Sequence, residues 1–374
     1  MPNSALPISF PLSTGEQPIT GLPYMPRGYV QLRSGFGEGA VVRLSKHLLA
    51  MTATVAALAL SSVNSAPAVA QPPRCTGASP SPPGAVDLGE ISPSGQVALG
   101  GDAFAGNGMG VGDWSPSIAL HIRPGTLNDI IQSDRTFGRG GTLYADTWHP
   151  DGGSQLPAGT IQVNGIDYAL ITRTKPRLQP VDSRLVRINP DGACWPTVDG
   201  SLRDAGWQDG NQTQISGYQA PDGWVYIVAD GFARDHTVRL YRCPAATFTD
   251  RNTWHAWGMV DGGPVWGWDA APTPLSSDLF GELSLRQIED KVVLSGFNQS
   301  TGNVEARVAN DVTQVLAPDT PVTIIASQQT LPFNYGGYIV PGSTLDQALI
   351  LVSQWDTHTN NPYNVHEFVA NLNR

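Results

Sequence analysis

The chain has 374 residues, with 22 Lys and Arg against 32 Asp and Glu, which gives a formal net charge of −10. The 41 Gly, the 31 Pro and a charged fraction of only 14% exclude a coiled coil or a disordered chain and favour strands joined by turns. The acidic balance, without a basic patch, argues against a nucleic-acid or anionic-membrane partner.

A secretory signal stands near the amino terminus. Basic residues within 43–47 precede an apolar run, Leu48–Leu60, and a small-residue ending, Ala68–Ala70. This order is typical of a signal peptide, and the apolar run is too short to span a bilayer comfortably. We expect cleavage after Ala70 and a protein that is secreted or held in the cell envelope, with no membrane span after cleavage. A retained membrane anchor is the alternative.

The signal divides the chain into three parts. Residues 1–40 are rich in Gly and Pro and show no periodic apolar pattern, so a start codon assigned too early is the simplest explanation for them. We predict a leader over residues 1–70, a Pro- and Ser-rich tether over 71–84 and a folded domain over 85–374. We expect this domain to be a monomer.

Three cysteines, Cys75, Cys194 and Cys243, follow the predicted cleavage position and therefore meet an oxidising compartment. One disulfide and one odd thiol are expected, with three pairings open. We favour Cys194 with Cys243, which lie in successive segments of similar outline. Neither a Cys-x-x-Cys nor a His-Glu-x-x-His spacing occurs, so we expect no metal or other cofactor. The acid surplus leaves a structural Ca²⁺ ion open, although no loop has EF-hand spacing.

Short apolar or alternating runs, each introduced by a polar turn, recur along the folded domain, where helical periodicity is almost absent. Five of them share one form: Gln96–Leu99, Ile166–Ile171, Trp224–Val228, Lys291–Leu294 and Gln347–Val352. Their regular spacing and their Asn-Gly and Asp-Gly turns predict four-stranded antiparallel blades arranged radially. We therefore expect an all-β fold, a five-bladed β-propeller. A two-sheet sandwich or two small β domains is the competing interpretation.

Carboxylates stand on both sides of the strand in the first unit. Asp87 and Asp102 bracket this strand, and an Asp beside glycines fits either a turn or a carboxylate placed in a cleft. Glycoside hydrolysis needs two carboxyl groups, one as acid to the leaving oxygen and one as base or nucleophile. Asp87 and Asp102 are therefore catalytic candidates. Glu282, which opens the fourth unit, is a third candidate, and a solvent-facing Glu at a strand end is its alternative.

Aromatic and polar side chains at strand exits are candidates for substrate binding. The 10 Trp residues all follow residue 113, and an indole can stack on the apolar face of a sugar ring. We expect Trp114, Trp148 and Trp355 to lie in a groove. Asp230 and Asn298 are polar side chains at strand exits, for which turn formation is the alternative.

The order of several short motifs resembles the domain-of-unknown-function 4185 family, which is grouped with glycoside hydrolase family 183. These motifs are Val86–Gly89, Gly101–Phe104, Trp114–Ser117, Asp222–Tyr226, Gly281–Ser284, Tyr335–Ile339 and Ser353–Trp355. The resemblance implies a five-bladed propeller that cuts internal linkages of D-arabinofuranan, the polymer of mycobacterial arabinogalactan and lipoarabinomannan. It also implies that the family's paired aspartates fall on Asp87 and Asp102, and that Tyr335 and Tyr338 bind substrate.

The sequence departs from the pattern of that family at a few positions. Ala103 stands where the family has Thr, Val340 stands where a His is expected, and residues 356–362 lengthen the stretch before Tyr363. These departures favour, as the alternative to an exported glycoside hydrolase, a non-catalytic glycan-binding propeller of the cell envelope. An interaction scaffold without a glycan ligand is a further alternative that the acidic surface allows.

Overall fold

The computed structural model describes residues 75, 78–79, 83–106, 108–127, 131–145, 153–356, 358 and 362–373. The described part is built from strands and short 3-10 helices, and none of those helices has the length and apolar character needed to cross a membrane. The predicted signal peptide and its cleavage position after Ala70 lie outside the described residues.

The strands form five antiparallel sheets, which we call blades one to five in chain order. Blade one contains β1 (Ala85–Ile91), β2 (Val97–Phe104), β3 (Trp114–Ile122) and β4 (Ser133–Phe137), and blade two contains β5 (Ser154–Val163), β6 (Ile166–Lys175), β7 (Gln179–Arg187) and β8 (Arg203–Asp204). Blade three contains β9 (Gln214–Gln219), β10 (Trp224–Asp230), β11 (Arg239–Pro244), β12 (His255–Met259) and β13 (Trp266–Trp268). Blade four contains β14 (Phe280–Ile288), β15 (Lys291–Asn298), β16 (Asn303–Ala309) and β17 (Val322–Ala326), and blade five contains β18 (Asn334–Ile339), β19 (Ala348–Trp355) and β20 (Tyr363–Ala370). The 3-10 helices span Pro176–Leu178, Trp207–Gly210, Ala245–Thr247, Arg251–Thr253, Val260–Gly262 and Val312–Gln314.

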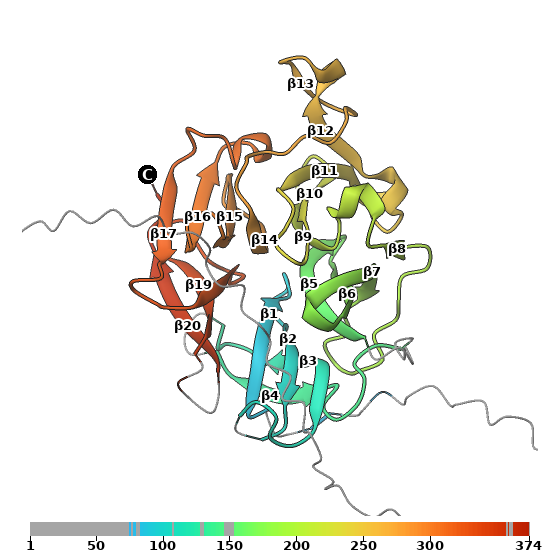
Figure 1. Cartoon of the computed structure of the whole chain (residues 1–374), viewed down its shortest axis with the longest axis vertical. Helices are drawn as coiled ribbons and strands as arrows, with labels where there is room; N and C mark the ends of the chain where they lie inside the picture. The colour runs from blue at the N-terminus through green and yellow to red at the C-terminus, as the bar shows by residue number, and fades with distance from the viewer. Residues whose placement is uncertain are drawn as a thin grey trace, which may run out of the picture. The chain divides into compact units, whose positions relative to one another are not determined.

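The blades stand around one centre (Figure 1). The innermost strand of each blade, β1, β5, β9, β14 or β18, contacts the innermost strands of both neighbouring blades, so the ring is closed. The predicted all-β, five-bladed β-propeller is therefore confirmed, and the sandwich alternative is excluded. The expected four strands occur in blades one, two and four, whereas blade three has five strands and blade five has three.

The five similar runs in the sequence correspond to the second strands of the five blades, β2, β6, β10, β15 and β19. A second strand has a strand on each side within its sheet and a neighbouring blade above or below it, so it is apolar along most of its length. Tight turns introduce some of these strands. Asn164 and Gly165, with φ of 51° and 75°, join β5 to β6 as a two-residue hairpin.

The hydrophobic core consists of five clusters, one between each pair of neighbouring blades. The cluster between blades five and one contains Leu88, Ile91, Tyr338, Val340 and Leu351. In the described residues each blade is made from one continuous stretch of chain, so this cluster joins the first and last blades by packing instead of by strand exchange. Apolar burial of this kind contributes roughly 25 cal/mol per Å².

A buried ion pair lies near the axis of the ring. Arg286 of β14 donates to Glu90 of β1 across 2.6 Å, and the two side chains are 9% and 1% exposed. Thr160 of β5 donates to Glu90 through its backbone N–H at 2.7 Å and through its hydroxyl at 2.8 Å. Burial raises the pKa of the Glu90 carboxyl, and Arg286 and these hydrogen bonds oppose the rise.

The same network reaches the remaining inner strands. Arg286 is 3.2 Å from the hydroxyl of Ser216 in β9. The hydroxyl of Ser284 in β14 donates to Glu90 at 3.1 Å and accepts from the backbone N–H of Ile339 in β18 at 3.1 Å. One set of hydrogen bonds therefore joins an inner strand from every blade.

The disulfide differs from the expected one. Cys75 pairs with Cys194, with 5.3 Å between their Cα atoms, and Cys243 is a free, buried thiol. The favoured pairing of Cys194 with Cys243 was wrong because the β11 register turns Cys243 into the apolar core between blades two and three. Cys194 instead lies in a loop. The next residue, Trp195, forms an isolated β-bridge with Tyr144, and Cys75 forms another with Thr142, so the two cysteines come close together.

The ion pair predicts a large difference between single and double variants. Glu90→Ala leaves the guanidinium of Arg286 buried without a counter-charge, and we expect a loss of about 3–5 kcal/mol in the free energy of unfolding. Glu90→Gln combined with Arg286→Met should recover most of that loss, because no unpaired charge remains buried. Urea unfolding followed by tryptophan fluorescence measures both. The exposed Arg123→Ala is the control and should change stability by less than about 0.5 kcal/mol. A Glu90→Ala variant as stable as the double variant would contradict the role of the pair.

Candidate active site

The ring places several of the predicted site residues at one end, where the inner strands begin. Asp87 lies near the start of β1, Glu282 near the start of β14 and Tyr335 near the start of β18. Because β2 runs antiparallel to β1, the end of β2 lies beside the start of β1. Asp87 in β1 pairs with Gly101 in β2, and Asp102 is the next residue of β2. The first blade therefore brings both predicted aspartates together.

Irregular backbone surrounds these side chains. The strand registers shift between Ala85 and Asp87, between Gly281 and Ser284, and between Asn334 and Gly336. Such bulges turn a side chain away from the direction that a regular strand would give it, and they are common next to active sites.

Two of the three predicted catalytic residues have a strained backbone. Asp102 has a φ of 42° and Glu282 a φ of 49°, both in the left-handed region that non-glycine residues rarely adopt. Arg234, which contacts Glu282, has a φ of 60°. Strain of this type costs on the order of 1–3 kcal/mol per residue and is concentrated at functional sites.

Asp87 is oriented by a tyrosine from the last blade. The buried Tyr335 hydroxyl donates a hydrogen bond to Oδ1 of Asp87. Burial, followed by the charge of Asp87, raises the pKa of Tyr335 well above its usual value, so the phenol keeps its proton and remains a donor. Tyr338, also buried, donates to the backbone carbonyl of Leu88 at 3.1 Å and supports the same strand.

Asp102 lies beside an exposed aromatic ring. The indole Nε1 of Trp114 donates to Oδ1 of Asp102 at 3.3 Å. Asp102 is 9% exposed, whereas Trp114, at the start of β3, is 43% exposed. The solvent-facing ring of Trp114 can stack on one sugar of a polymer. The glycosidic linkage of that sugar would then lie over the carboxylate of Asp102.

Glu282 is held by Arg234, a residue that the sequence analysis did not identify. Arg234 donates through Nε to Oε2 at 3.0 Å and through a second nitrogen to Oε1, so the contact is a two-point fork. The guanidinium also lies 5.7 Å from the centre of the Tyr335 ring. A Cβ at position 281 would come within 2.6 Å of the Arg234 side chain, so Gly281 is required for this arrangement.

Asp230 is a buried carboxyl next to this pair. It ends β10, has an exposed fraction of 0%, and neither of its oxygens has a hydrogen-bond partner in the described part of the chain. Burial raises its pKa well above the usual value, the charge of Glu282 raises it further, and Arg234 opposes the rise. The surroundings of Asp230 therefore favour its neutral form.

Gln214 is a second residue that the sequence analysis missed. It faces Asp230 in the pairing of β9 with β10. With its amide oriented so that the oxygen accepts, Gln214 receives hydrogen bonds from the backbone N–H groups of Glu282 and Leu283, and so holds the bulge that carries Glu282. Neither Gln214 nor Arg234 belongs to a recognisable motif. The glycine directly before Glu282, Gly281, is the indirect sign that another side chain packs closely there.

The remaining predicted binding residues have other surroundings. Asn298, fully buried at the end of β15, donates to Asp278 and Glu305 and accepts from the N–H of Ser300, so it stabilises the hairpin. Trp355 is half-buried and packs edge-on against Tyr363, with 4.8 Å between ring centres. Trp148 lies outside the described residues.

Two positions that depart from the family pattern lie in the protein interior. Ala103 is 3% exposed in β2, and Val340 is 1% exposed in the cluster between blades five and one. Within the part of the chain that the structure covers, no group of three or more His, Cys, Asp or Glu side chains is arranged to hold a metal ion.

Comparison with known sequences finds relatives over most of the chain. A family model described as "Domain of unknown function (DUF4185)" matches residues 84–368. A Mycolicibacterium smegmatis protein, named "Uncharacterized 35.9 kDa protein in asd 3'region", is 41% identical over 314 residues, which cover 77% of this chain and 92% of the relative. The Aspergillus versicolor protein named "Notoamide biosynthesis cluster protein J'" is 31% identical over 143 residues, 37% of this chain and 38% of that protein.

Comparison with solved structures supports the architecture. A Bacteroides ovatus protein, solved as "a putative hydrolase", superposes with a TM-score of 0.53 over 79% of this chain and 86% of that chain, at 12% sequence identity. At this identity the similarity concerns the fold alone.

The buried Asp230 carboxyl predicts an unusual dependence of stability on pH. Its pKa is higher in the folded than in the unfolded chain, so its contribution to stability is complete below the unfolded pKa of about 3.9 and is lost as pH rises through the folded pKa. Asp230→Asn should therefore melt several degrees higher than the wild type at neutral pH, and the difference should shrink towards pH 4. Calorimetry across this range is the measurement. The exposed Asp319→Asn serves as the control. A lower melting temperature for Asp230→Asn at neutral pH would mean that the carboxylate is charged and paired.

Proposed function

The chain belongs to the DUF4185 family, and from this premise and the acidic end of the propeller we propose that it is an exported glycoside hydrolase that cuts internal linkages of D-arabinofuranan. The observation that carries the proposal is the convergence of Asp87 and Asp102 on adjacent strands, beside the exposed Trp114. Carboxyl pairs in this setting are what glycosidic bond cleavage requires.

Asp87 and Asp102 divide the chemistry between them. One carboxyl protonates the oxygen of the leaving sugar, and the other either removes a proton from the attacking water or attacks the anomeric carbon itself. Tyr335 and Trp114 donate hydrogen bonds to the two carboxyls and so fix their directions before substrate arrives. Such preorganisation avoids a reorientation cost during the reaction.

Glu282 supports the reaction from the opposite side of the ring. Its fork with Arg234 holds it in one position, and its side chain remains 22% exposed, so it can accept a hydrogen bond from a sugar hydroxyl. Burial and the charge of Glu282 favour the neutral form of Asp230, which adds no further negative charge to a site that already contains three acidic side chains. This limits the repulsion between carboxylates, which would otherwise oppose ionisation.

The proposal of D-arabinan as the substrate rests on a resemblance to the DUF4185 family. The motifs that carry this resemblance include those that contain Asp87, Asp102, Glu282 and Tyr335. The proposed export agrees with the observed disulfide between Cys75 and Cys194, because disulfides persist in oxidising compartments. The acidic character of the chain, with a net charge of −10, favours a neutral polymer over an anionic one.

A second candidate is a non-catalytic glycan-binding propeller. It is favoured by Ala103 and Val340, which are buried and apolar where the family has polar side chains. A reaction that depends on a hydroxyl or an imidazole at those positions would fail here, whereas stacking on Trp114 would remain.

Incubation of the purified protein with mycobacterial D-arabinan, with plant L-arabinan as the control polymer, distinguishes the two. Chromatography should reveal oligosaccharides from D-arabinan only. Binding to the polymer without products would support the glycan-binding alternative, and the absence of both would overturn the proposal.

The two aspartates should be indispensable for turnover. We expect Asp87→Asn and Asp102→Asn each to lower kcat by at least about 100-fold, the low end of what a positioned acid or base contributes, with little change in melting temperature. Product release measured by reducing-end assay tests this, and the exposed Asp319→Asn should retain full activity. Activity that survives both changes would exclude Asp87 and Asp102 as the catalytic pair.

A further inference from the structure

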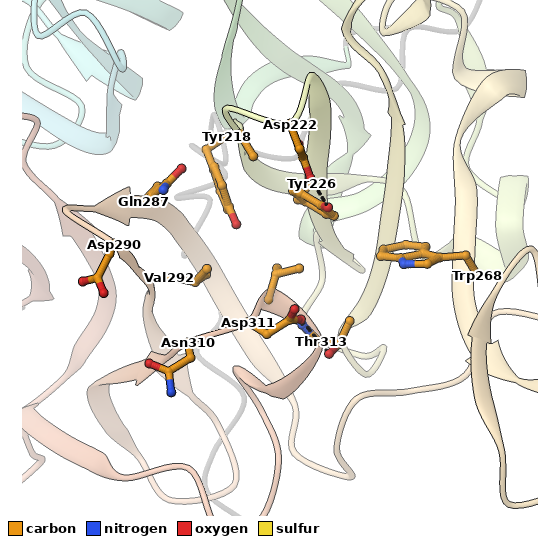
Figure 2. Close-up of a pocket in the computed structure, with 12 residues that line it drawn as sticks. Tyr218, Asp222, Tyr226, Trp268, Gln287, Asp290, Val292, Asn310, Asp311 and Thr313 are labelled. Atoms are coloured by element: carbon orange, nitrogen blue, oxygen red, sulfur yellow. Dashed lines mark hydrogen bonds between the residues drawn. The ribbon is translucent and has the colours of Figure 1, made fainter.

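A groove lies at the opposite end of the ring, where the inner strands finish. A cavity of about 200 Å³ between blades three and four is lined by Tyr218, Tyr226 and Trp268 (Figure 2). A second cavity, of about 630 Å³, is lined by the ends of β5, β9, β14 and β18 and by the turn residue Pro93. The two share Tyr218, Ala220 and Gln287, so they form one continuous depression, which we call the far-end groove.

One arm of the far-end groove carries contiguous aromatic rings. The ring centres of Tyr218 and Tyr226 are 5.8 Å apart, and those of Tyr226 and Trp268 are 5.9 Å apart. The guanidinium of Arg242 stacks 4.2 Å from the centre of the Trp268 ring and holds that indole in place. A row of rings on a surface offers successive apolar faces to a ligand made of repeated rings.

The charge of the far-end groove is negative, but its carboxylates already have partners. Asp222 accepts from the Tyr226 hydroxyl at 2.8 Å, as the dashed line in Figure 2 shows. Asp311 accepts from the N–H of Thr313, Asp290 pairs with Lys291, and Glu289 accepts from the N–H of Leu345. These acids repel anionic ligands such as phosphates or uronates. Within the described residues no three of them are grouped to hold a metal ion.

Neutral polar groups of the groove remain available. The Tyr218 hydroxyl and the Asn310 amide make no hydrogen bond within the described residues. Burial, together with the charges of Asp311 and Asp222, raises the pKa of Tyr218, so its hydroxyl remains a neutral donor and acceptor. The groove therefore offers aromatic rings together with neutral hydrogen-bond donors and acceptors. A ligand that complements both is a ring with an apolar face that also carries hydroxyl groups.

We propose that the far-end groove is a second, non-catalytic binding site for a neutral polysaccharide, with Tyr218 and Trp268 as its stacking platform. Only the choice of D-arabinan as the probe rests on the proposed function. A site of this kind holds one stretch of polymer while another is cut, which raises the local concentration of linkages near the acidic end.

The groove and the acidic end are separate sites. Tyr218 and Gln214 lie four residues apart on β9, a rise of roughly 13 Å at about 3.3 Å per residue. The buried network of Glu90, Thr160 and Arg286 lies between the two ends, and Arg286 lines the floor of the groove. A sugar in the groove therefore does not contact Asp87 or Asp102.

Titration of the full-length Asp87→Asn/Asp102→Asn double variant with D-arabinan oligosaccharides tests the proposal without cleavage of the probe. The indole N–H signals of Trp268 and Trp114, followed by NMR, report the groove and the acidic end separately. We expect both to shift. A shift of Trp268 alone supports the groove and counts against the acidic end, whereas a shift of Trp114 alone overturns the groove and leaves the proposed function standing.

Variants in that background identify the contacts. Trp268→Ala should weaken binding in the groove by about tenfold, the equivalent of about 1.4 kcal/mol. Tyr218→Phe, which keeps the ring, should weaken it by a few-fold. Trp207→Ala is the control, because its half-buried indole lines neither cavity and packs against Arg203, whose guanidinium lies 4.7 Å from the ring centre. Equal weakening by Trp207→Ala and Trp268→Ala would overturn the proposal, as would affinity unchanged by Trp268→Ala.

Two further probes test the class of ligand. Oligogalacturonate, which is anionic, should leave the Trp268 signal unmoved. Tetramethylammonium should also leave it unmoved, and a saturable shift with this cation in the absence of any shift with sugar would assign the groove to organic cations instead.

Discussion

The buried ion pair between Glu90 and Arg286 fixes how the five blades meet. Apolar clusters fill the spaces between neighbouring blades, but apolar contact alone is tolerant of small rotations and slips. The ion pair and its hydroxyl partners are directional, and they reach an inner strand of every blade. Because an unpaired charge at this depth is costly, the network favours the one arrangement in which every member has a partner.

That arrangement produces two chemically different ends. At the end where the inner strands begin, Asp87, Asp102 and Glu282 lie at bulges or on left-handed backbone. At the end where they finish, regular hairpins present aromatic rings and neutral polar groups. At the acidic end the left-handed backbone falls on candidate catalytic residues themselves, Asp102 and Glu282, as expected if that end performs the reaction.

Electrostatics explains how so many acids share the first end. Glu282 is compensated by Arg234, burial favours the neutral form of Asp230, and Asp87 and Asp102 each accept a hydrogen bond from an aromatic side chain. The carboxyls therefore differ in environment, which allows neighbouring acids to take different roles in one reaction. Arg234 and Gln214 hold this arrangement, and their positions depend on blade three facing blade four.

By itself the sequence determined the fold class, the number of blades and the family, because second strands are continuously apolar and the motifs keep their order. It also placed Asp87 and Asp102 on neighbouring strands, because they lie close along the chain. Only the tertiary structure decided which distant residues meet. It paired Cys75 with Cys194, Glu90 with Arg286 and Arg234 with Glu282, across separations that no local pattern records. A strand's periodicity reveals which face is buried, whereas its partners across the ring are set by how the blades close.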